Sequence, residues 1–307
     1  MTALLLFASV ARGETTSEGG DAAATSNLPP DPFGEIVLEE KAAGFSVPVD
    51  RSRGSFVLDA EEGTYLPGSH FAHWTWTMQA PRWGNFYAGL LYESARPKLG
   101  VQLKVGEDAV LKSYAPRTNP LAKGEPLVLG NVYLPKAGEF PVTLLTGDQS
   151  NVPAFQVTGV HFRPAPESEP HGQSIDGTIE LLASTATTYA ETMRYEPAPE
   201  KDCLGFWRDE KDWAEWVFDV SKPGNFKIVL HYGCGSGTDG SRAALLVNEH
   251  TVEFDIADTG GFQKWREIEL GSVELDRKGP NRLAILPLEL KGKALMDVRK
   301  IVLTPTE

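Results

Sequence analysis

The 307-residue chain lacks an excess of positive charge, because 42 Asp and Glu outnumber 29 Lys and Arg and give a formal net charge of −13. Phosphate-rich surfaces repel an acidic protein, so nucleic acid and anionic membranes are not expected as main partners. The sequence also lacks an apolar run of the roughly 18 residues that a membrane-spanning helix needs. We therefore expect no membrane span, and neutral or weakly charged ligands remain open. A highly sulfated glycan would require a local patch of Lys or Arg.

Recognisable catalytic motifs are absent from the sequence. The six histidines are scattered, no pair of them flanks a glutamate as in zinc proteases, and neither a nucleophile elbow nor a phosphate-binding loop occurs. The glycine-rich stretch from Gly233 to Ser241 precedes a strand pattern rather than a helix, which is typical of a turn between strands. We therefore predict that the protein is not an enzyme.

Cysteine is scarce, since only Cys203 and Cys234 occur. An exported protein can join them, and the alternative is two buried free thiols, because the sequence does not show whether their Cα atoms approach within about 7 Å. Both lie beside strands that we expect to be neighbours in one sheet. We therefore predict a Cys203–Cys234 disulfide if the protein is exported.

The N-terminal residues have the features of an export signal. An apolar run from Ala3 to Val10 is followed by small residues, although no Lys or Arg precedes it. This pattern predicts a signal peptide over residues 1–13 and a secreted or periplasmic protein. Residues 14–30 contain almost no large apolar side chains, so we predict a disordered leader there.

The remaining chain contains an internal repeat. The segment from Ala72 to Tyr92 aligns with the segment from Ala214 to Tyr232, which pairs Trp74 with Trp216, and two further blocks follow in the same order. Three ordered matches at an offset of about 140 residues indicate a duplicated unit. We predict a first domain at 31–164, a Pro-rich linker at 165–175 and a second domain at 176–307. Trp74 and Trp216 are expected to be equivalent core residues.

Hydrophobic residues alternate with polar ones in both copies. The stretch "NFKIVLHY" places Phe226, Ile228, Leu230 and Tyr232 on one face, and similar short runs recur between Gly-rich or Pro-rich turns. Many short strands without a long helical pattern favour an all-β protein. We predict two tandem antiparallel β-sandwiches of the jelly-roll type.

Aromatic residues in the second copy have polar neighbours, a combination typical of sugar binding. Trp207 and Phe262 lie beside Arg208 and Gln263 in segments that we expect to be loops at strand ends, and Trp265 follows. Sugar C–H faces stack on aromatic rings while their hydroxyls bond to polar side chains. Because an odd step separates Phe262 from Trp265, we expect one ring exposed and one buried. We assign Phe262 as the exposed ring, and the reverse assignment remains open.

The second copy resembles family-six carbohydrate-binding modules and the related C-terminal domains of bacterial fucosidases and sulfatases. The similarity covers residues 176 to 305 and includes the stretches "DWAEWVFDVSKPGNF" and "TGGFQKW". It implies a galactose-binding-like jelly roll that holds a sugar between Phe262 and an aromatic ring from the loop of Phe206 and Trp207. It also implies a structural calcium ion near Glu180 and Asp297. The chain departs from the family pattern by having Phe262 in place of Trp and no Asn before the last strand.

These observations lead to two hypotheses of different class. The first is an exported, non-catalytic protein that binds a polysaccharide or other glycan through aromatic residues at the rim of a β-sandwich. The second is a structural or interaction protein whose two jelly rolls dock an enzyme or another exported protein. A glycan array separates them.

Overall fold

The computed structural model describes residues 49–67, 72–95, 98–118, 126–147, 155–235, 237–248 and 250–306. The predicted signal peptide at 1–13 and leader at 14–30 lie outside these residues. Within the described part, the one helical element is the 3-10 helix η1 (Ala183–Thr185), and no helix is long and apolar enough to cross a membrane.

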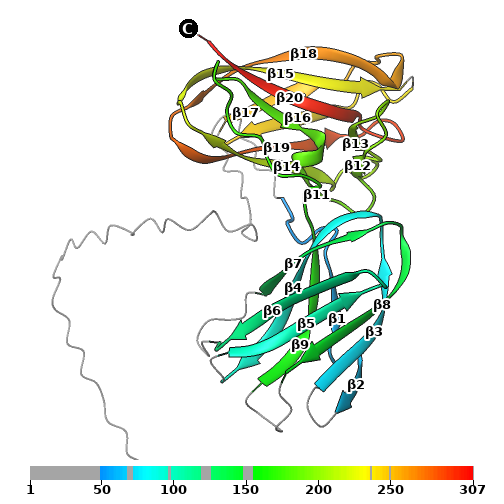
Figure 1. The fold of residues 1–307 in the computed structure, drawn as a ribbon. Helices are drawn as coiled ribbons and strands as arrows, with labels where there is room; N and C mark the ends of the chain where they lie inside the picture. The colour runs from blue at the N-terminus through cyan, green and yellow to red at the C-terminus, as the bar shows by residue number, and fades with distance from the viewer. Residues whose placement is uncertain are drawn as a thin grey trace, which may run out of the picture. The chain divides into compact units, whose positions relative to one another are not determined.

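Residues 56–164 form a sandwich of two antiparallel sheets, with strand orders β1-β9-β4-β7 and β2-β3-β8-β5-β6 (Figure 1). Its strands are β1 (Phe56–Asp59), β2 (Thr64–Pro67), β3 (Ala72–Ala80), β4 (Gly84–Ser94), β5 (Lys98–Val105), β6 (Ala109–Pro116), β7 (Leu127–Leu134), β8 (Gly138–Thr146) and β9 (Phe155–Pro164). Side chains from both sheets fill one core, among them Phe86, Phe162, Met78 and Leu103.

Residues 179–305 form a second sandwich. One sheet has the order β12-β13-β20-β15-β18, with β10 also pairing with β20, and the other has the order β11-β14-β19-β16-β17. The strands are β10 (Ile179–Leu182), β11 (Thr187–Tyr189), β12 (Arg194–Glu196), β13 (Cys203–Gly205), β14 (Trp213–Val220), β15 (Gly224–Cys234), β16 (Arg242–Val247), β17 (His250–Asp255), β18 (Gly261–Leu275), β19 (Gly279–Glu289) and β20 (Asp297–Pro305).

The alternation in the sequence corresponds to the observed burial. In β15, the residues Phe226, Ile228, Leu230 and Tyr232 are buried in the core of the second sandwich, and the residues between them are more exposed. Side chains alternate across a strand, so one face of the sheet meets the core and the other does not. The predicted all-β fold of two antiparallel sandwiches is confirmed.

The core tryptophans are equivalent in a register that differs from the sequence alignment. Trp76 lies four residues before the end of β3 and Trp216 four residues before the end of β14. The indole N–H of Trp76 donates to the carbonyl of Asp59 at 2.7 Å, and that of Trp216 donates to Leu182 at 2.8 Å. Trp74 is only half-buried and packs at the edge of the core. The predicted pairing of Trp74 with Trp216 is therefore wrong by two residues, because Trp76 is the equivalent of Trp216.

A segment that precedes β1 packs on the second sandwich. Val49 joins a cluster of apolar side chains on the outer face of the β14-β19-β16 region. The guanidinium of Arg51 donates to Glu215 at 2.7 Å, with both side chains buried, and the indole N–H of Trp213 donates to the carbonyl of Asp50 at 3.0 Å. This sheet is thus covered on both faces, which explains the continuous apolar run of β16.

Candidate functional site

The glycine-rich end of β15 lies between β20 and β18. Gly233 pairs with Asp297 at the start of β20, and Cys234 pairs with Gly261 at the start of β18. A Cβ atom on Gly233 would lie 2.1 Å from the carbonyl oxygen of Phe262, and one on Gly235 would lie 2.7 Å from its ring. Both glycines are therefore needed for the close approach of Phe262 to this backbone.

Phe262 and its neighbour place an aromatic ring and an amide at this strand end. The Phe262 ring is half-buried against Gly235, whereas Gln263 is exposed. The amide of Gln263 donates to the Oδ2 atom of Asp297 at 3.3 Å. The register of β15 and β18 shifts between Tyr232 and Cys234, so several residues of β18 bulge out opposite Gly233. The bulge is what directs Phe262 and Gln263 toward the rim of the sandwich.

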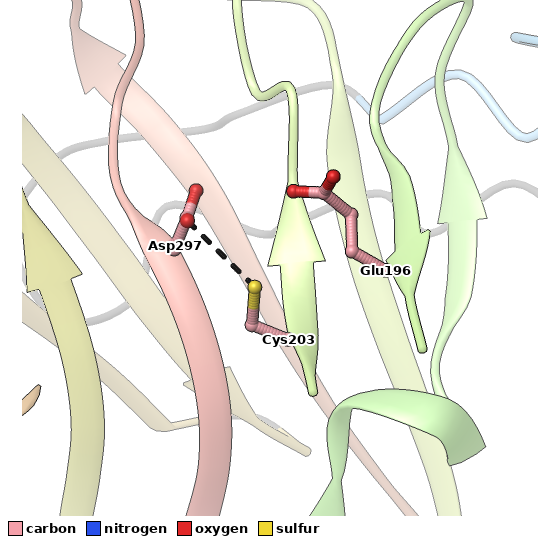
Figure 2. Close-up of side chains that lie close together, drawn as sticks. All are labelled: Glu196, Cys203 and Asp297. Carbon is pink, nitrogen blue, oxygen red and sulfur yellow. Dashed lines mark hydrogen bonds between the residues drawn. The ribbon is translucent and has the colours of Figure 1, made fainter. Parts of the chain in front are cut away.

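Three buried titratable side chains, two carboxyls and one thiol, meet beside Gln263. Glu196 of β12, Cys203 of β13 and Asp297 of β20 point toward one another, and their ligand atoms all lie within 4.8 Å (Figure 2). The Cys203 thiol donates to Asp297 Oδ2 at 3.7 Å, and the Lys201 ammonium donates to Glu196 Oε1 at 2.6 Å. Gly205 leaves room for this arrangement, because a Cβ there would lie 2.4 Å from Glu196 Oε2.

Burial controls the protonation of this cluster. Removal from water, and secondly the nearby Glu196 carboxylate, raise the pKa of Asp297 to about 7. Burial likewise raises the pKa of the Cys203 thiol, which therefore stays neutral at neutral pH. Lys201 compensates Glu196 and its pKa is raised by that hydrogen bond. Asp297 thus exchanges its proton in the neutral pH range.

The predicted calcium ligands are not brought together. Glu180 is opposite Val302 in the β10–β20 register, five positions along the strand from Asp297, a separation of roughly 17 Å. Glu180 instead accepts a hydrogen bond from Lys300 at 2.7 Å. The group beside Asp297 contains a thiol, and calcium takes oxygen ligands. The resemblance-based assignment of a calcium site to Glu180 and Asp297 is therefore wrong.

Comparison with solved structures shows similarity to carbohydrate-binding modules. The C-terminal family-six module (CBM6) of LamC, a marine laminarinase from Zobellia galactanivorans, is 18% identical, covers 41% of this chain and 98% of its own, and has a TM-score of 0.33. A family 35 module from Clostridium thermocellum is 16% identical over 42% of this chain and 98% of its own, with a TM-score of 0.35. A Paenibacillus xanthan lyase is 11% identical over 91% of this chain and 27% of its own, with a TM-score of 0.34.

Similarity at the level of sequence families is not found. No protein-family model matches the chain, and no curated protein matches it.

The aromatic residues predicted to lie opposite Phe262 have other roles. Trp207 is fully buried, and its indole N–H donates to the carbonyl of Asp212 at 2.9 Å. Phe206 is half-buried, and the Arg194 guanidinium lies 3.6 Å from its ring centroid. The exposed Arg208 is also over the Phe206 ring, at 5.0 Å. Trp207 therefore has no face for a sugar, and a cation already covers Phe206.

Trp265 is not the core residue that the odd spacing predicted. It is half-buried, lies outside the core cluster, and has the Arg299 guanidinium 5.2 Å from its ring centroid. The bulge between β15 and β18 breaks the strict alternation on which the prediction depended. Phe262 and Trp265 are both partly accessible.

The predicted disulfide is contradicted, because Cys203 and Cys234 are both free and buried. Strand β20 lies between β13, which carries Cys203, and β15, which carries Cys234. Two strand spacings separate the cysteines by roughly 9–10 Å, beyond the usual Cα separation in a disulfide. Cys234 instead lies 3.2 Å from the Thr238 hydroxyl.

Sequence analysis missed Glu196, Lys201 and Gly235. Glu196 and Lys201 are ordinary charged residues in the sequence, and they join Asp297 only because β12, β13 and β20 are neighbours. Gly235 belongs to the glycine-rich stretch that was assigned to a turn. Its spacing of two from Gly233 was the available signal, because two glycines on one face allow another segment to approach closely.

Proposed function

We propose that the protein is an exported, non-catalytic glycan-binding protein whose second sandwich binds a sugar at the glycine-rich end of β15. The observation that carries the proposal is the half-exposed Phe262 ring seated on Gly235, with the Gln263 amide hydrogen-bonded to Asp297 beside it. Export is supported by the signal-like residues 1–13.

The chemistry of this site suits a neutral pyranose. A sugar C–H face stacks on the accessible face of Phe262, and its hydroxyls exchange hydrogen bonds with the exposed Gln263 amide, which the buried Asp297 carboxyl holds in place. One ring contact contributes about 1 kcal/mol, so a shallow site of this kind binds in roughly the millimolar to high micromolar range. An acidic sugar is disfavoured here by Asp297 and Glu196.

The two carboxyl groups do not support glycoside hydrolysis. Glycosidases place two carboxyl groups on either side of the scissile bond, about 5 Å or more apart with the sugar between them. Glu196 and Asp297 are each less than one-tenth exposed, their oxygens lie within 4.8 Å, and Lys201 and Cys203 occupy their remaining surroundings. There is no room for a pyranose between them, so the proposal is for binding alone.

The test is titration of the full-length protein with a panel of neutral and acidic polysaccharides, followed by substitution. We expect saturable binding of a neutral glycan, and Phe262→Ala should weaken it below detection while the melting temperature stays nearly constant. Trp265→Ala should retain both binding and folding. Saturable binding that Phe262→Ala leaves intact would contradict this site.

Gly235→Ala provides a second test that keeps the aromatic ring. The added Cβ would lie 2.7 Å from the Phe262 ring, which must then move. We expect a loss of affinity of about tenfold. Gly172→Ala is the matched control, because a Cβ at Gly172 meets no atom within 4 Å. A panel without any binding would favour the docking hypothesis instead.

A further inference from the structure

The first sandwich has a hollow on the outer face of its five-stranded sheet. It measures about 460 Å³, within the usual range of small-ligand sites. Its lining includes Gly100, Gln102, Lys112, Tyr114, Leu145 and Gly147. Gly100 pairs with Tyr114 across β5 and β6, and Gln102 pairs with Lys112 in the next row. These paired positions place all four residues on one face of the sheet.

Two glycines form the floor of this hollow. The Gly147 N–H donates to the carbonyl of Gly100 at 2.8 Å, so the two backbones are in contact. A Cβ on Gly100 would meet no atom within 4 Å, which means that the space above it is open. Leu145 and Tyr114 stand on either side, because they belong to the strands that flank β5.

Tyr114 is an exposed aromatic ring between two lysines. It is 63% exposed, compared with 53% for Tyr133 and 50% for Tyr65. The ammonium group of Lys98 lies 4.2 Å from the ring centroid. Lys112 precedes Tyr114 by two positions on β6 and therefore projects from the same face. An aromatic ring, an amide and two cations thus meet at this hollow.

Among the described residues of this five-stranded sheet, the acidic side chains lie away from Tyr114. The acidic residues Glu107 and Asp108 follow the far end of β5, and Glu139 lies at the far end of β8, roughly 20 Å from Leu145. The chain as a whole carries a formal net charge of −13. The two lysines therefore form a local positive patch at the Tyr114 end of the sheet. At the Phe262 site, by contrast, the Gln263 amide bonds to a carboxyl group, that of Asp297.

We propose that this hollow is a second binding site, which takes an acidic saccharide that carries carboxylate groups. The sugar ring stacks on the face of Tyr114 that Lys98 does not cover, Gln102 bonds to a hydroxyl, and Lys112 pairs with the carboxylate. Lys98, over the other face of Tyr114, adds a second positive charge nearby. A neutral sugar gains at most hydrogen bonds from the two ammonium groups, whereas a uronate gains an ion pair in addition to the ring contact. This site is independent of the one at Phe262, and the two select saccharides of different charge.

The experiment is a calorimetric titration of the full-length protein with oligogalacturonate and with the same oligosaccharide after reduction of its carboxylates to alcohols. We expect the charged form to bind at least about ten times more tightly, and added salt should weaken that binding. Tyr114→Ala should abolish binding, and Lys112→Gln should weaken it several-fold. Tyr133→Ala and Lys136→Gln are matched controls, because both residues are exposed elsewhere on the first sandwich and should leave affinity unchanged.

Several results would overturn the proposal. They are equal affinity for the reduced oligosaccharide, no binding of either form, binding that survives Tyr114→Ala, or a preference for a sulfated galactan. Phe262→Ala separates this site from the proposed function, because it should leave uronate binding intact while removing binding of the neutral glycan. Since Tyr114 is exposed, its substitution should not change the melting temperature, which a thermal scan of each variant verifies.

Discussion

At the scale of single residues, Asp297 shows how burial changes the chemistry of a side chain. It is only 5% exposed, it lies beside Glu196, and its hydrogen bonds come from a neutral thiol and an amide. A buried carboxyl without a cationic partner favours its protonated form. This is why the pKa of Asp297 is raised to about 7 from an ordinary value of 3.8.

The raised pKa of Asp297 predicts a specific pH dependence of stability. Between pH 4 and 7 the folded protein holds a proton that the unfolded chain releases, so stability decreases as pH rises through this window. The full effect is at most about 4 kcal/mol. Asp297→Asn, which mimics the protonated form, should match the wild type near pH 4 and exceed it by a few kcal/mol at pH 8. Urea unfolding at both pH values measures this difference.

Glu180→Gln is the control for this prediction. Glu180 is an exposed carboxylate that pairs with Lys300, so its substitution should change stability by less than about 1 kcal/mol. An Asp297→Asn variant that is less stable than the wild type at pH 8 would show that Asp297 is needed as a carboxylate.

At the scale of strands, the tryptophans of β3 and β14 connect each sheet to the first strand of its own sandwich. Trp76 bonds to Asp59 at the end of β1, and Trp216 bonds to Leu182 at the end of β10. A buried indole N–H needs an acceptor, and the same type of backbone position supplies it in both sandwiches. The equivalence is thus one of hydrogen bonding as well as packing.

We predict that Trp76→Ala and Trp216→Ala each destabilise their own sandwich by about 3 to 5 kcal/mol, because a large buried ring is lost. Trp74→Ala should cost only about 1 to 2 kcal/mol, since Trp74 is half-buried. Hydrogen exchange followed by mass spectrometry locates the effect: exchange should rise in β3 and β8 for Trp76→Ala, and in β14 and β19 for Trp216→Ala. Equal losses of stability for Trp74→Ala and Trp76→Ala would contradict the assignment of Trp76, rather than Trp74, as the equivalent of Trp216.

At the scale of the whole molecule, the segment from Val49 to Gly54 belongs to the first half of the chain but packs on the second sandwich. Its main polar contact is Arg51 with Glu215, and Arg282 also donates to Glu215 at 2.7 Å. Arg53 donates to Asp212 at 2.6 Å. Removal of one partner from a buried ion pair of this kind strongly destabilises a protein, because the other charge stays buried without compensation.

We predict that Arg51→Ala destabilises the second sandwich by about 3 kcal/mol, although Arg51 is 164 positions from Glu215 in the sequence. The double variant Arg51→Ala with Glu215→Gln should recover part of the loss, because the neutral amide removes a buried negative charge that Arg282 alone would otherwise compensate. Lys227→Ala, which breaks an exposed pair with Glu269, should have almost no effect. Hydrogen exchange in β14 and β19 measures all three variants, and unchanged exchange for Arg51→Ala would exclude a stabilising role of this segment.

The sequence by itself determined the fold class and the faces of individual strands. The alternation in "NFKIVLHY" is a local property, because successive side chains of a strand point to opposite sides whatever the strand pairs with. The same reasoning failed at Trp265, where a bulge against β15 shifts the alternation by contacts that the sequence does not display.

Only the tertiary structure decided which strands are neighbours. The position of β20 between β13 and β15 separates Cys203 from Cys234 and brings Cys203 and Glu196 to Asp297. Likewise, the segment at Val49 and Asp50 covers the outer face of the second sandwich, where Trp213 is buried against Tyr189. The physical reason is that strand order is set by the total apolar area that the sheets bury together, whereas each strand's own pattern specifies only which of its sides is apolar.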